Sequence, residues 1–161
     1  MANLTEKTKV TTGYSANGLP YLRLGNSQRT AVFFEGLTFE NKPPSGIQLR
    51  WVSGDYKRWA EDFTVYQIGR KPHLPEGYTT RDMAKDYADM IREEIGKPVD
   101  VIGLSTGGTI AQYFALDYPE LVDHLVLAST GYRLKETGKN LQLLVNAFFH
   151  LPCLANSPTK S

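Results

Sequence analysis

The sequence predicts a doubly wound α/β fold with a mostly parallel sheet and helices on both of its faces. From about residue 60 onward, strand-like and helix-like patterns follow one another in the order strand, helix, strand, helix, strand. This alternation is typical of parallel strands joined by right-handed crossovers. Residues 30–34 are also an uninterrupted apolar run. A strand that is apolar on both sides is buried on both faces, as in a parallel sheet.

The first part of the chain predicts strands and one helix. Residues 8–24 read as two short strands around a turn at residues 15–18, because turn-forming residues separate two stretches of strand-like composition. The buried strand at 30–34 follows. A helix is then expected from the Pro-Pro-Ser-Gly run that starts at Pro43 to about Trp59, followed by a strand over residues 63–68.

The second part begins with a clear helix start. Thr79 and Asp82 have the spacing of a capping box, and apolar residues recur at helical spacing as far as Ile95. A strand over 99–102, a helix over 109–118 and a strand over 124–128 complete the alternation. Residues 141–151 carry an apolar stripe that predicts an amphipathic helix, and the residues after Pro152 are expected to be a frayed tail.

Composition excludes several classes of protein. The 161 residues carry 18 basic and 17 acidic side chains without clustering, so no nucleic-acid partner is expected. A single cysteine, Cys153, excludes an internal disulfide framework. There is no apolar signal core and no run of about 18 apolar residues. We therefore expect a cytoplasmic protein without a membrane partner, and no motif predicts a bound cofactor or metal ion.

Residues 103–108 read Gly-Leu-Ser-Thr-Gly-Gly and match the pattern G-x-S-x-G between a strand and a helix. A serine at a sharp strand-to-helix turn is strained and exposed, as a nucleophile needs to be. Ser105 is the predicted nucleophile. Gly103 and Gly107 are expected to remove side chains that would crowd each other, and Gly108 to let the helix approach the sheet.

An anion-stabilising pocket is expected beside Ser105. The backbone N–H of Thr106 opens the helix, whose N-terminus carries partial positive charge, and is the first predicted oxyanion donor. The second is predicted in the loop after the strand at 30–34, at the N–H of Leu37. Glu35 lies in the same loop, and we expect it to be a solvated carboxylate rather than a cleft residue.

A dinucleotide-binding turn is the rival interpretation of the glycines. That fingerprint needs G-x-G-x-x-G and an acid at the end of the next strand. Here Ser105 stands where the second glycine would be, and Asp123 is expected to precede its strand. A Walker-type loop is excluded because no Gly-Lys-Ser/Thr follows.

With these motifs in place, residues 18–132 resemble the N-terminal half of an α/β-hydrolase-fold protein. The runs at 77–84, 112–115 and 118–122 are similar to the prolyl-iminopeptidase, haloperoxidase and esterase-like branch. The resemblance implies a serine hydrolase that cleaves a small ester or amide through an acyl-enzyme on Ser105. Such families usually have a His-Gly pair where this chain has Glu35 and Gly36.

In that fold the triad runs Ser, then Asp or Glu, then His, and the acid and histidine normally follow later strands. We therefore expect a C-terminally truncated core over residues 1–134, with 135–161 as the start of a cap region and a tail. Glu136 and His150 have the formal order for a triad with Ser105, but His150 ends the predicted apolar helix and is more typical of a packed residue. His73 is expected in a surface loop and His124 at a strand entry, so we expect the chain to lack the triad acid and histidine.

Truncation would leave an apolar sheet edge at residues 125–127, through which the chain is expected to self-associate. A non-catalytic binding module and a prematurely ended, inactive product remain the alternatives to an active hydrolase.

Overall fold

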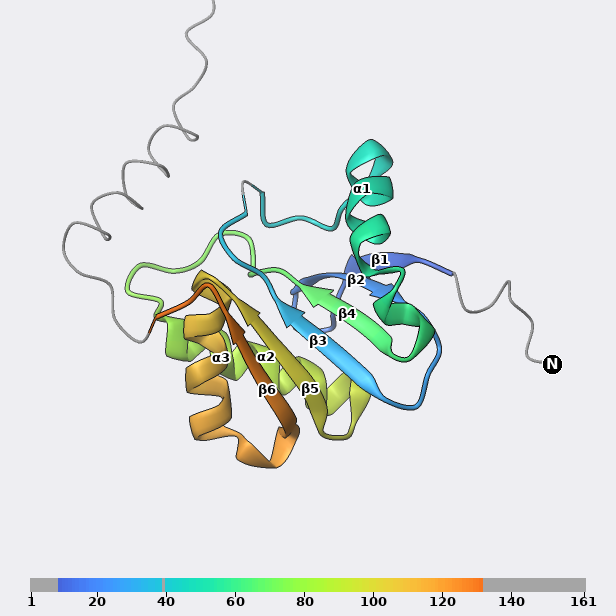
Figure 1. The fold of residues 1–161 in the computed structure, drawn as a ribbon. Helices are drawn as coiled ribbons and strands as arrows, with labels where there is room; N and C mark the ends of the chain where they lie inside the picture. Colours follow the sequence, from blue (N-terminus) through green and yellow to red (C-terminus); the bar gives the residue numbers. More distant parts are fainter. Residues whose placement is uncertain (1–8, 39, 132–161) are drawn as a thin grey trace, which may run out of the picture.

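The structure is a computed structural model that describes residues 9–38 and 40–131. Its centre is a sheet with the strand order β1-β2-β4-β3-β5-β6 (Figure 1). The strands are β1 (Thr11–Tyr14), β2 (Pro20–Leu24), β3 (Thr30–Phe34), β4 (Thr64–Ile68), β5 (Val99–Leu104) and β6 (Val122–Ala128). Strands β4, β3, β5 and β6 are parallel, and β1 and β2 are antiparallel to their neighbours. The predicted mostly parallel sheet is confirmed.

Helical segments connect the parallel strands. They are α1 (Gly46–Tyr56), η1 (Trp59–Glu61), α2 (Thr80–Met90), the π-helical turn η2 (Ile91–Ile95), α3 (Thr106–Asp117) and η3 (Pro119–Leu121). The capping box at the start of α2 is confirmed, since the Thr79 hydroxyl accepts from the Asp82 N–H and the Asp82 carboxylate accepts from the Thr79 N–H.

Several boundaries differ from the prediction, among them the starts of α3 and β6. Helix α3 begins at Thr106, three residues before the predicted start at Thr109. Strand β6 begins at Val122, so Asp123 lies inside the strand and not before it. The register passes from Val99 opposite Val122 to Asp100 opposite His124, which leaves Asp123 as the extra residue of a β-bulge.

Both faces of the sheet are covered, as a doubly wound fold requires. On one face Phe34 packs edge-on against Tyr87 of α2 at 4.6 Å and Phe114 of α3 at 5.2 Å between ring centroids. On the other face Phe33 packs against Tyr56 of α1 at 4.7 Å and Trp59 of η1 at 5.2 Å. The unbroken apolar pattern of β3 arises because its two faces contact different helices.

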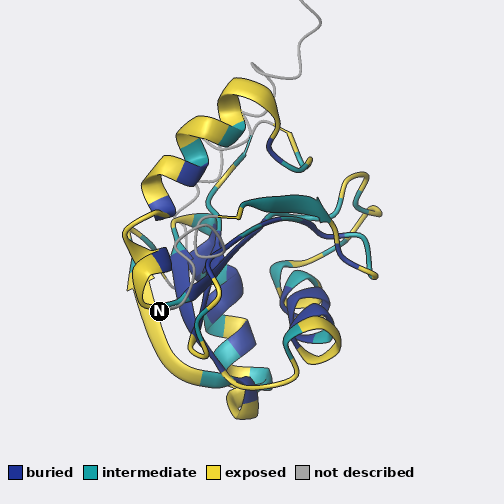
Figure 2. Ribbon diagram, turned by 90° about the vertical axis from the view of Figure 1, so that its right-hand side faces the viewer, coloured by how far each residue is buried: buried dark blue, intermediate teal, exposed yellow. Residues whose placement is uncertain are grey.

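Helix α1 covers its face less completely than α2 and α3 cover theirs. Figure 2 shows most of α1 as exposed, and Ile47 and Trp51 have 76% and 77% of their surface exposed. Only one side of α1, which includes Leu49, Val52 and Tyr56, packs against the core.

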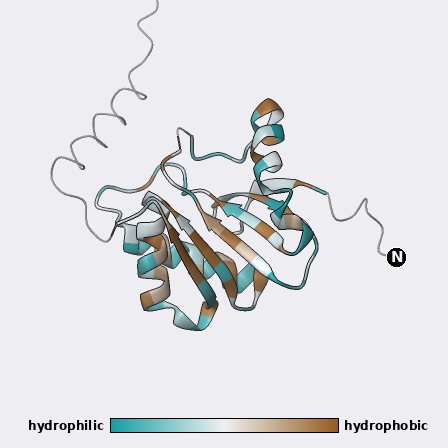
Figure 3. Cartoon of the chain, in the orientation of Figure 1, coloured by the Kyte–Doolittle hydropathy of each residue, from teal (hydrophilic) through white to brown (hydrophobic). Residues whose placement is uncertain are grey.

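Strand β6 is an apolar edge in the described part of the chain. Leu125, Val126 and Leu127 are 38%, 51% and 43% exposed, and Figure 3 shows the strand as hydrophobic. One side of β6 pairs with β5, and no strand among residues 9–38 and 40–131 pairs with the other. The predicted exposed edge is therefore observed, whereas the predicted helix at 141–151, the tail and Cys153 lie outside the described residues.

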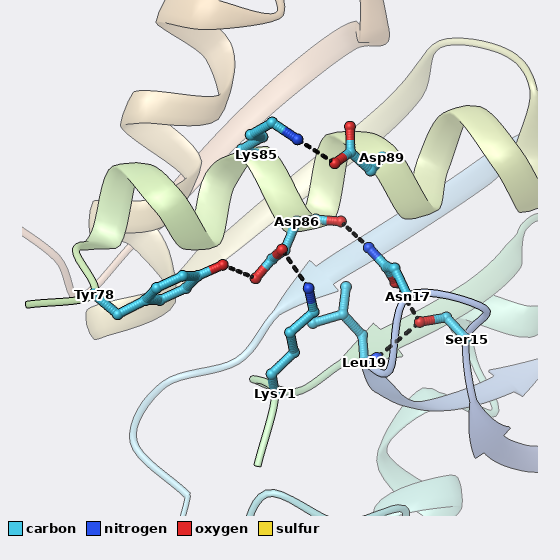
Figure 4. Close-up of polar contacts among 8 residues, drawn as sticks. All are labelled: Ser15, Asn17, Leu19, Lys71, Tyr78, Lys85, Asp86 and Asp89. Carbon is cyan, nitrogen blue, oxygen red and sulfur yellow. Dashed lines mark hydrogen bonds and ion pairs between the residues drawn. The ribbon is translucent and has the colours of Figure 1, made fainter. Parts of the chain in front are cut away.

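A buried carboxylate fixes the loop that follows β4. Asp86 of α2 accepts hydrogen bonds from Lys71 Nζ and from the Tyr78 hydroxyl, each at 2.6 Å (Figure 4). Its main-chain oxygen accepts from Asn17 Nδ2 at 2.8 Å. The ion pair between Lys85 and Asp89 lies on the same helix. The loop over residues 69–78 is thus held to α2 near both of its ends.

No helix in the described ranges is long and apolar enough to cross a membrane.

Candidate active site

Ser105 occupies a strained turn between β5 and α3. Its backbone has φ 51° and ψ −119°, a conformation that costs a non-glycine residue about 1–3 kcal/mol. Its N–H donates to the carbonyl of Ala128 at 3.0 Å, and its own carbonyl accepts from the Gly108 N–H at 3.0 Å. Ser105 is exposed, and its hydroxyl makes no hydrogen bond with any described residue. The turn therefore presents an exposed hydroxyl at the carboxyl end of the sheet.

The glycines around Ser105 are required by close contacts with the surrounding segments. A Cβ on Gly107 would lie 2.0 Å from the carbonyl oxygen of Phe34. A Cβ on Gly103 would lie 2.7 Å from both the Gly108 Cα and the Ala111 Cβ. Helix α3 approaches β5 at Gly108, and Gly107 turns toward the end of β3. The expected crowding between side chains at Gly103 and Gly107 stays a prediction.

The missing side chain of Gly108 allows two close contacts. It lets α3 lie close to β5 at Gly103, as expected, and it also leaves room for Thr130 after β6. A Cβ on Gly108 would be 2.5 Å from the Thr130 Cβ. The turn is therefore enclosed by the ends of β3, β5 and β6.

The loop after β3 lies directly against Ser105. A Cβ on Gly36 would be 3.3 Å from the Ser105 Cβ and 3.9 Å from its Oγ. Leu37 follows Gly36, and Thr106 follows Ser105, so the two residues predicted to donate oxyanion hydrogen bonds flank the serine from different segments. Their roles as donors stay a prediction.

Arg70, which sequence analysis missed, joins these two segments. Its Nη1 donates to the carbonyl of Gly36 at 2.8 Å, and its Nη2 donates to the carbonyl of Glu35 at 3.2 Å and to Thr106 Oγ1 at 2.6 Å. Neighbouring parallel strands end at the same edge of a sheet, so residues just after β4 come near those after β3. The sequence alone did not show that β3 and β4 are neighbours.

Glu35 is partly buried and bonded, so its interpretation as a solvated carboxylate was wrong. The buried Gln67 of β4 donates from Nε2 to Glu35 Oε1. Burial raises the pKa of Glu35, while the hydrogen bond from Gln67 and the positive charge of Arg70 act in the opposite direction. A titratable carboxyl therefore lies in the loop that borders Ser105.

An open cavity of about 610 Å³ adjoins this loop. Leu37 and Arg70 connect it to the surroundings of Ser105, which does not itself line the cavity. Its wall further out mixes apolar and basic side chains, among them Leu74, Met83, Lys42 and His73. A small molecule bound here would lie next to the loop that carries Leu37.

The structure does not bring a described histidine into hydrogen-bonding contact with Ser105. His73 is an exposed loop residue, as expected. His124 Nδ1 lies 2.5 Å from Asp100 Oδ1, at the end of β5 opposite to Ser105, also as expected. Glu136 and His150 lie outside the described residues. No group of three or more His, Cys, Asp or Glu side chains in the described ranges is arranged to hold a metal.

Comparison with known proteins agrees with this architecture. Residues 46–152 match the family model described as alpha/beta hydrolase fold. The chain is 41% identical over 69 residues to a poly(3-hydroxyalkanoate) depolymerase of Ectopseudomonas oleovorans, which is 43% of this chain and 24% of that protein. It is 42% identical over 59 residues to a non-heme bromoperoxidase homologue of Mycobacterium tuberculosis, which is 37% of this chain and 22% of that protein.

Solved structures show the same fold. A hydrolase from Pseudomonas aeruginosa superposes with a TM-score of 0.65 at 18% identity, covering 87% of this chain and 53% of that protein. The chain thus spans about half the length of this solved structure, and its matched segments make up about a quarter of the relatives named above. The family model covers well over half of the 161 residues, and the chain belongs to the α/β-hydrolase fold family.

Proposed function

We propose that the chain carries the nucleophile of a serine hydrolase that cleaves an ester or amide through an acyl-enzyme on Ser105. The observation that carries this proposal is the exposed hydroxyl of Ser105 on a strained strand-to-helix turn. Strain of this kind persists where the surrounding structure enforces it, and it occurs often at active sites. The close contacts of Gly103, Gly107 and Gly108 are the enforcing structure.

In this reaction Ser105 Oγ attacks the carbonyl carbon, and the carbonyl oxygen becomes an oxyanion. The alcohol or amine departs with a proton, and water then attacks the acyl-enzyme to release the acid. The N–H groups of Thr106 and Leu37 would stabilise the oxyanion. A histidine held by an acid would supply the base, and the hydrolytic activity of the whole protein is part of the same proposal.

The substrate in this proposal is a small molecule that enters through the cavity beside Leu37 and Arg70. No cofactor, nucleic acid or membrane is needed for this chemistry. We also propose a cytoplasmic location and self-association through the exposed edge of β6, where Leu125, Val126 and Leu127 are available for contact.

A non-catalytic binding module is the second candidate. Two observations favour it: the cavity is large enough for a small ligand, and neither His73 nor His124 is hydrogen-bonded to Ser105. In that case the chain would bind small molecules saturably without turning them over.

Covalent labelling with a fluorophosphonate, measured by intact mass, tests the proposal. We expect one label per wild-type chain, none on Ser105→Ala, and full labelling of Ser129→Ala. Ser129 is a matched control because it is also exposed and also has a positive φ, of 52°. Circular dichroism would establish that each variant is folded. A folded wild-type chain that stays unlabelled would refute the hydrolase and favour the binding module.

A further inference from the structure

We propose that Arg70 is a positioning residue that fixes the loop after β3 to the first turn of α3 and thereby sets the direction of the Leu37 N–H beside Ser105. The inference deepens the proposed function and rests on it, because it concerns the geometry of the predicted oxyanion hole. Its structural part can be measured without any hydrolytic activity.

The first step in the argument is the rigidity of the peptide unit. The carbonyl of Gly36 and the N–H of Leu37 belong to one planar trans peptide, so they point in opposite directions. Arg70 Nη1 binds the Gly36 oxygen at 2.8 Å, and this contact fixes the direction of the Leu37 N–H. Nη2 binds the preceding carbonyl, of Glu35, at 3.2 Å, so two successive peptide planes are held.

The second step is the connection to α3. The same Nη2 donates to Thr106 Oγ1 at 2.6 Å, and Thr106 supplies the other predicted donor N–H. One guanidinium therefore spans the two backbone segments that flank Ser105. Its planar fork of five N–H donors suits this task, whereas a lysine ammonium is a compact point charge on a flexible stem.

The third step is that Arg70 is itself fixed on both sides along the chain. Before it, the Gly69 N–H donates to the carbonyl of Pro20 at 2.9 Å. After it, Lys71 Nζ is bonded to the buried Asp86 at 2.6 Å. The backbone that carries Arg70 is thus anchored to β2 and α2, which gives the guanidinium a stable base from which to orient the loop.

The fourth step concerns charge. The side chain is partly buried, and positive charge near a partly desolvated oxyanion acts more strongly than it would in water. Arg70 also lowers the pKa of Glu35 against the effect of burial. The guanidinium therefore stabilises negative charge beside the loop, in addition to orienting the loop.

The experiment compares Arg70→Ala, Arg70→Gln and Arg70→Lys in the whole chain, with Arg81→Gln as the matched control. Arg81 also donates two hydrogen bonds, to Asp117, but on the exposed side of α2 and α3. Amide hydrogen exchange is followed by mass spectrometry in peptides covering residues 35–38 and 105–108. We expect about tenfold faster exchange at 35–38 in the Arg70 variants, because hydrogen bonds to a charged group are lost, and no change in Arg81→Gln.

The rate of fluorophosphonate labelling is the second measurement. We expect it to fall about tenfold to a hundredfold in Arg70→Ala, since a misdirected oxyanion donor has an effect approaching that of a missing one. Added guanidinium ion should restore part of the rate in Arg70→Ala, while potassium ion at equal ionic strength should not. Arg70→Lys, which keeps the charge but not the fork, should remain slow.

The outcomes separate this inference from the proposed function. Unchanged exchange at residues 35–38 in folded Arg70→Ala and Arg70→Gln would overturn the inference whether or not the chain is labelled. A wild-type chain that is never labelled, but whose loop exchanges faster without Arg70, would refute the hydrolase and leave only the structural part. Labelling of Arg70→Lys at the wild-type rate would show that a positive charge is sufficient. It would overturn the proposal that the planar guanidinium donors orient the loop.

Discussion

The carbonyl oxygen of Phe34 lies where a side chain on Gly107 would have to begin, since a Cβ built on that glycine would be 2.0 Å from it. This contact joins the end of β3 to the first turn of α3. It determines how closely the loop that carries Glu35 and Gly36 can approach Ser105, and it involves backbone atoms that cannot move aside as a flexible side chain can.

Substitution Gly107→Ala should therefore destabilise the protein by about 3 kcal/mol, at the upper end of the usual cost of overpacking. Gly54→Ala is the control, because Gly54 lies in α1 with nothing within 4 Å of a new Cβ. That change should stabilise the protein by about 0.5–1 kcal/mol, as expected for replacing a helical glycine. Urea denaturation measures both, and equal stabilities of Gly107→Ala and wild type would contradict the contact.

Strain at Ser105 gives a second prediction. Because φ is 51° there, the variant Ser105→Gly should be more stable than Ser105→Ala by about 1 kcal/mol. The order should reverse at Ser53, inside α1, where alanine should be more stable than glycine by about 1 kcal/mol. Thermal and urea unfolding of the four variants would test this. An alanine advantage at both positions would mean that the turn relaxes without its serine.

The carboxyl of Glu35 predicts a pH dependence of stability. Burial raises its pKa above the ordinary value of 4.5, so the folded state binds this proton more tightly than the unfolded state does. The contribution is fully present below the unfolded pKa and is lost as the pH rises through the folded pKa. Glu35→Gln, which can still accept from Gln67, should therefore gain stability relative to wild type as the pH increases from 4 toward 7.

Urea denaturation at a series of pH values measures this difference. The stability of Glu35→Gln relative to wild type should increase steadily across the titration. A flat difference for Glu35→Gln would show that the carboxyl has the same pKa in both states.

The capping box of α2 gives a prediction about the hydroxyl of Thr79. This hydroxyl accepts from the Asp82 N–H, and Thr79→Ala should cost about 1 kcal/mol of stability, the usual value for a lost N-cap. Thr80→Ala, one residue into the helix, should change stability by less than about 0.5 kcal/mol. Equal losses in the two variants would assign the effect to something other than the cap.

The elements of the fold could be predicted because their signals are local. The apolar run of β3 and the capping box at Thr79 each lie within a few consecutive residues, and the structure confirms both. The start of α3 was predicted three residues late because local signals alone place glycines outside a helix. Gly107 and Gly108 are poor helix formers, and only the close approach of β3 and Thr130 explains why they lie in a helix.

The surroundings of Ser105 were harder to predict because they depend on which strands are neighbours. Arg70 contacts Thr106, 36 residues away, and Gln67 contacts Glu35, 32 residues away. Both contacts follow from the position of β4 beside β3 in the strand order. No local pattern encodes that position, so the sequence indicated the serine and its glycines but not the residues that join the loops around them.

Asp86 connects segments that the sequence keeps apart: its main-chain oxygen accepts from Asn17, and its carboxylate accepts from Lys71 and Tyr78 at the two ends of one loop. Opening the outer wall of the cavity would break bonds to a buried group of the core helix. We therefore expect the wall and α2 to open together in local unfolding. Motion that admits a ligand from this side is therefore expected to carry the free energy of disturbing a packed helix.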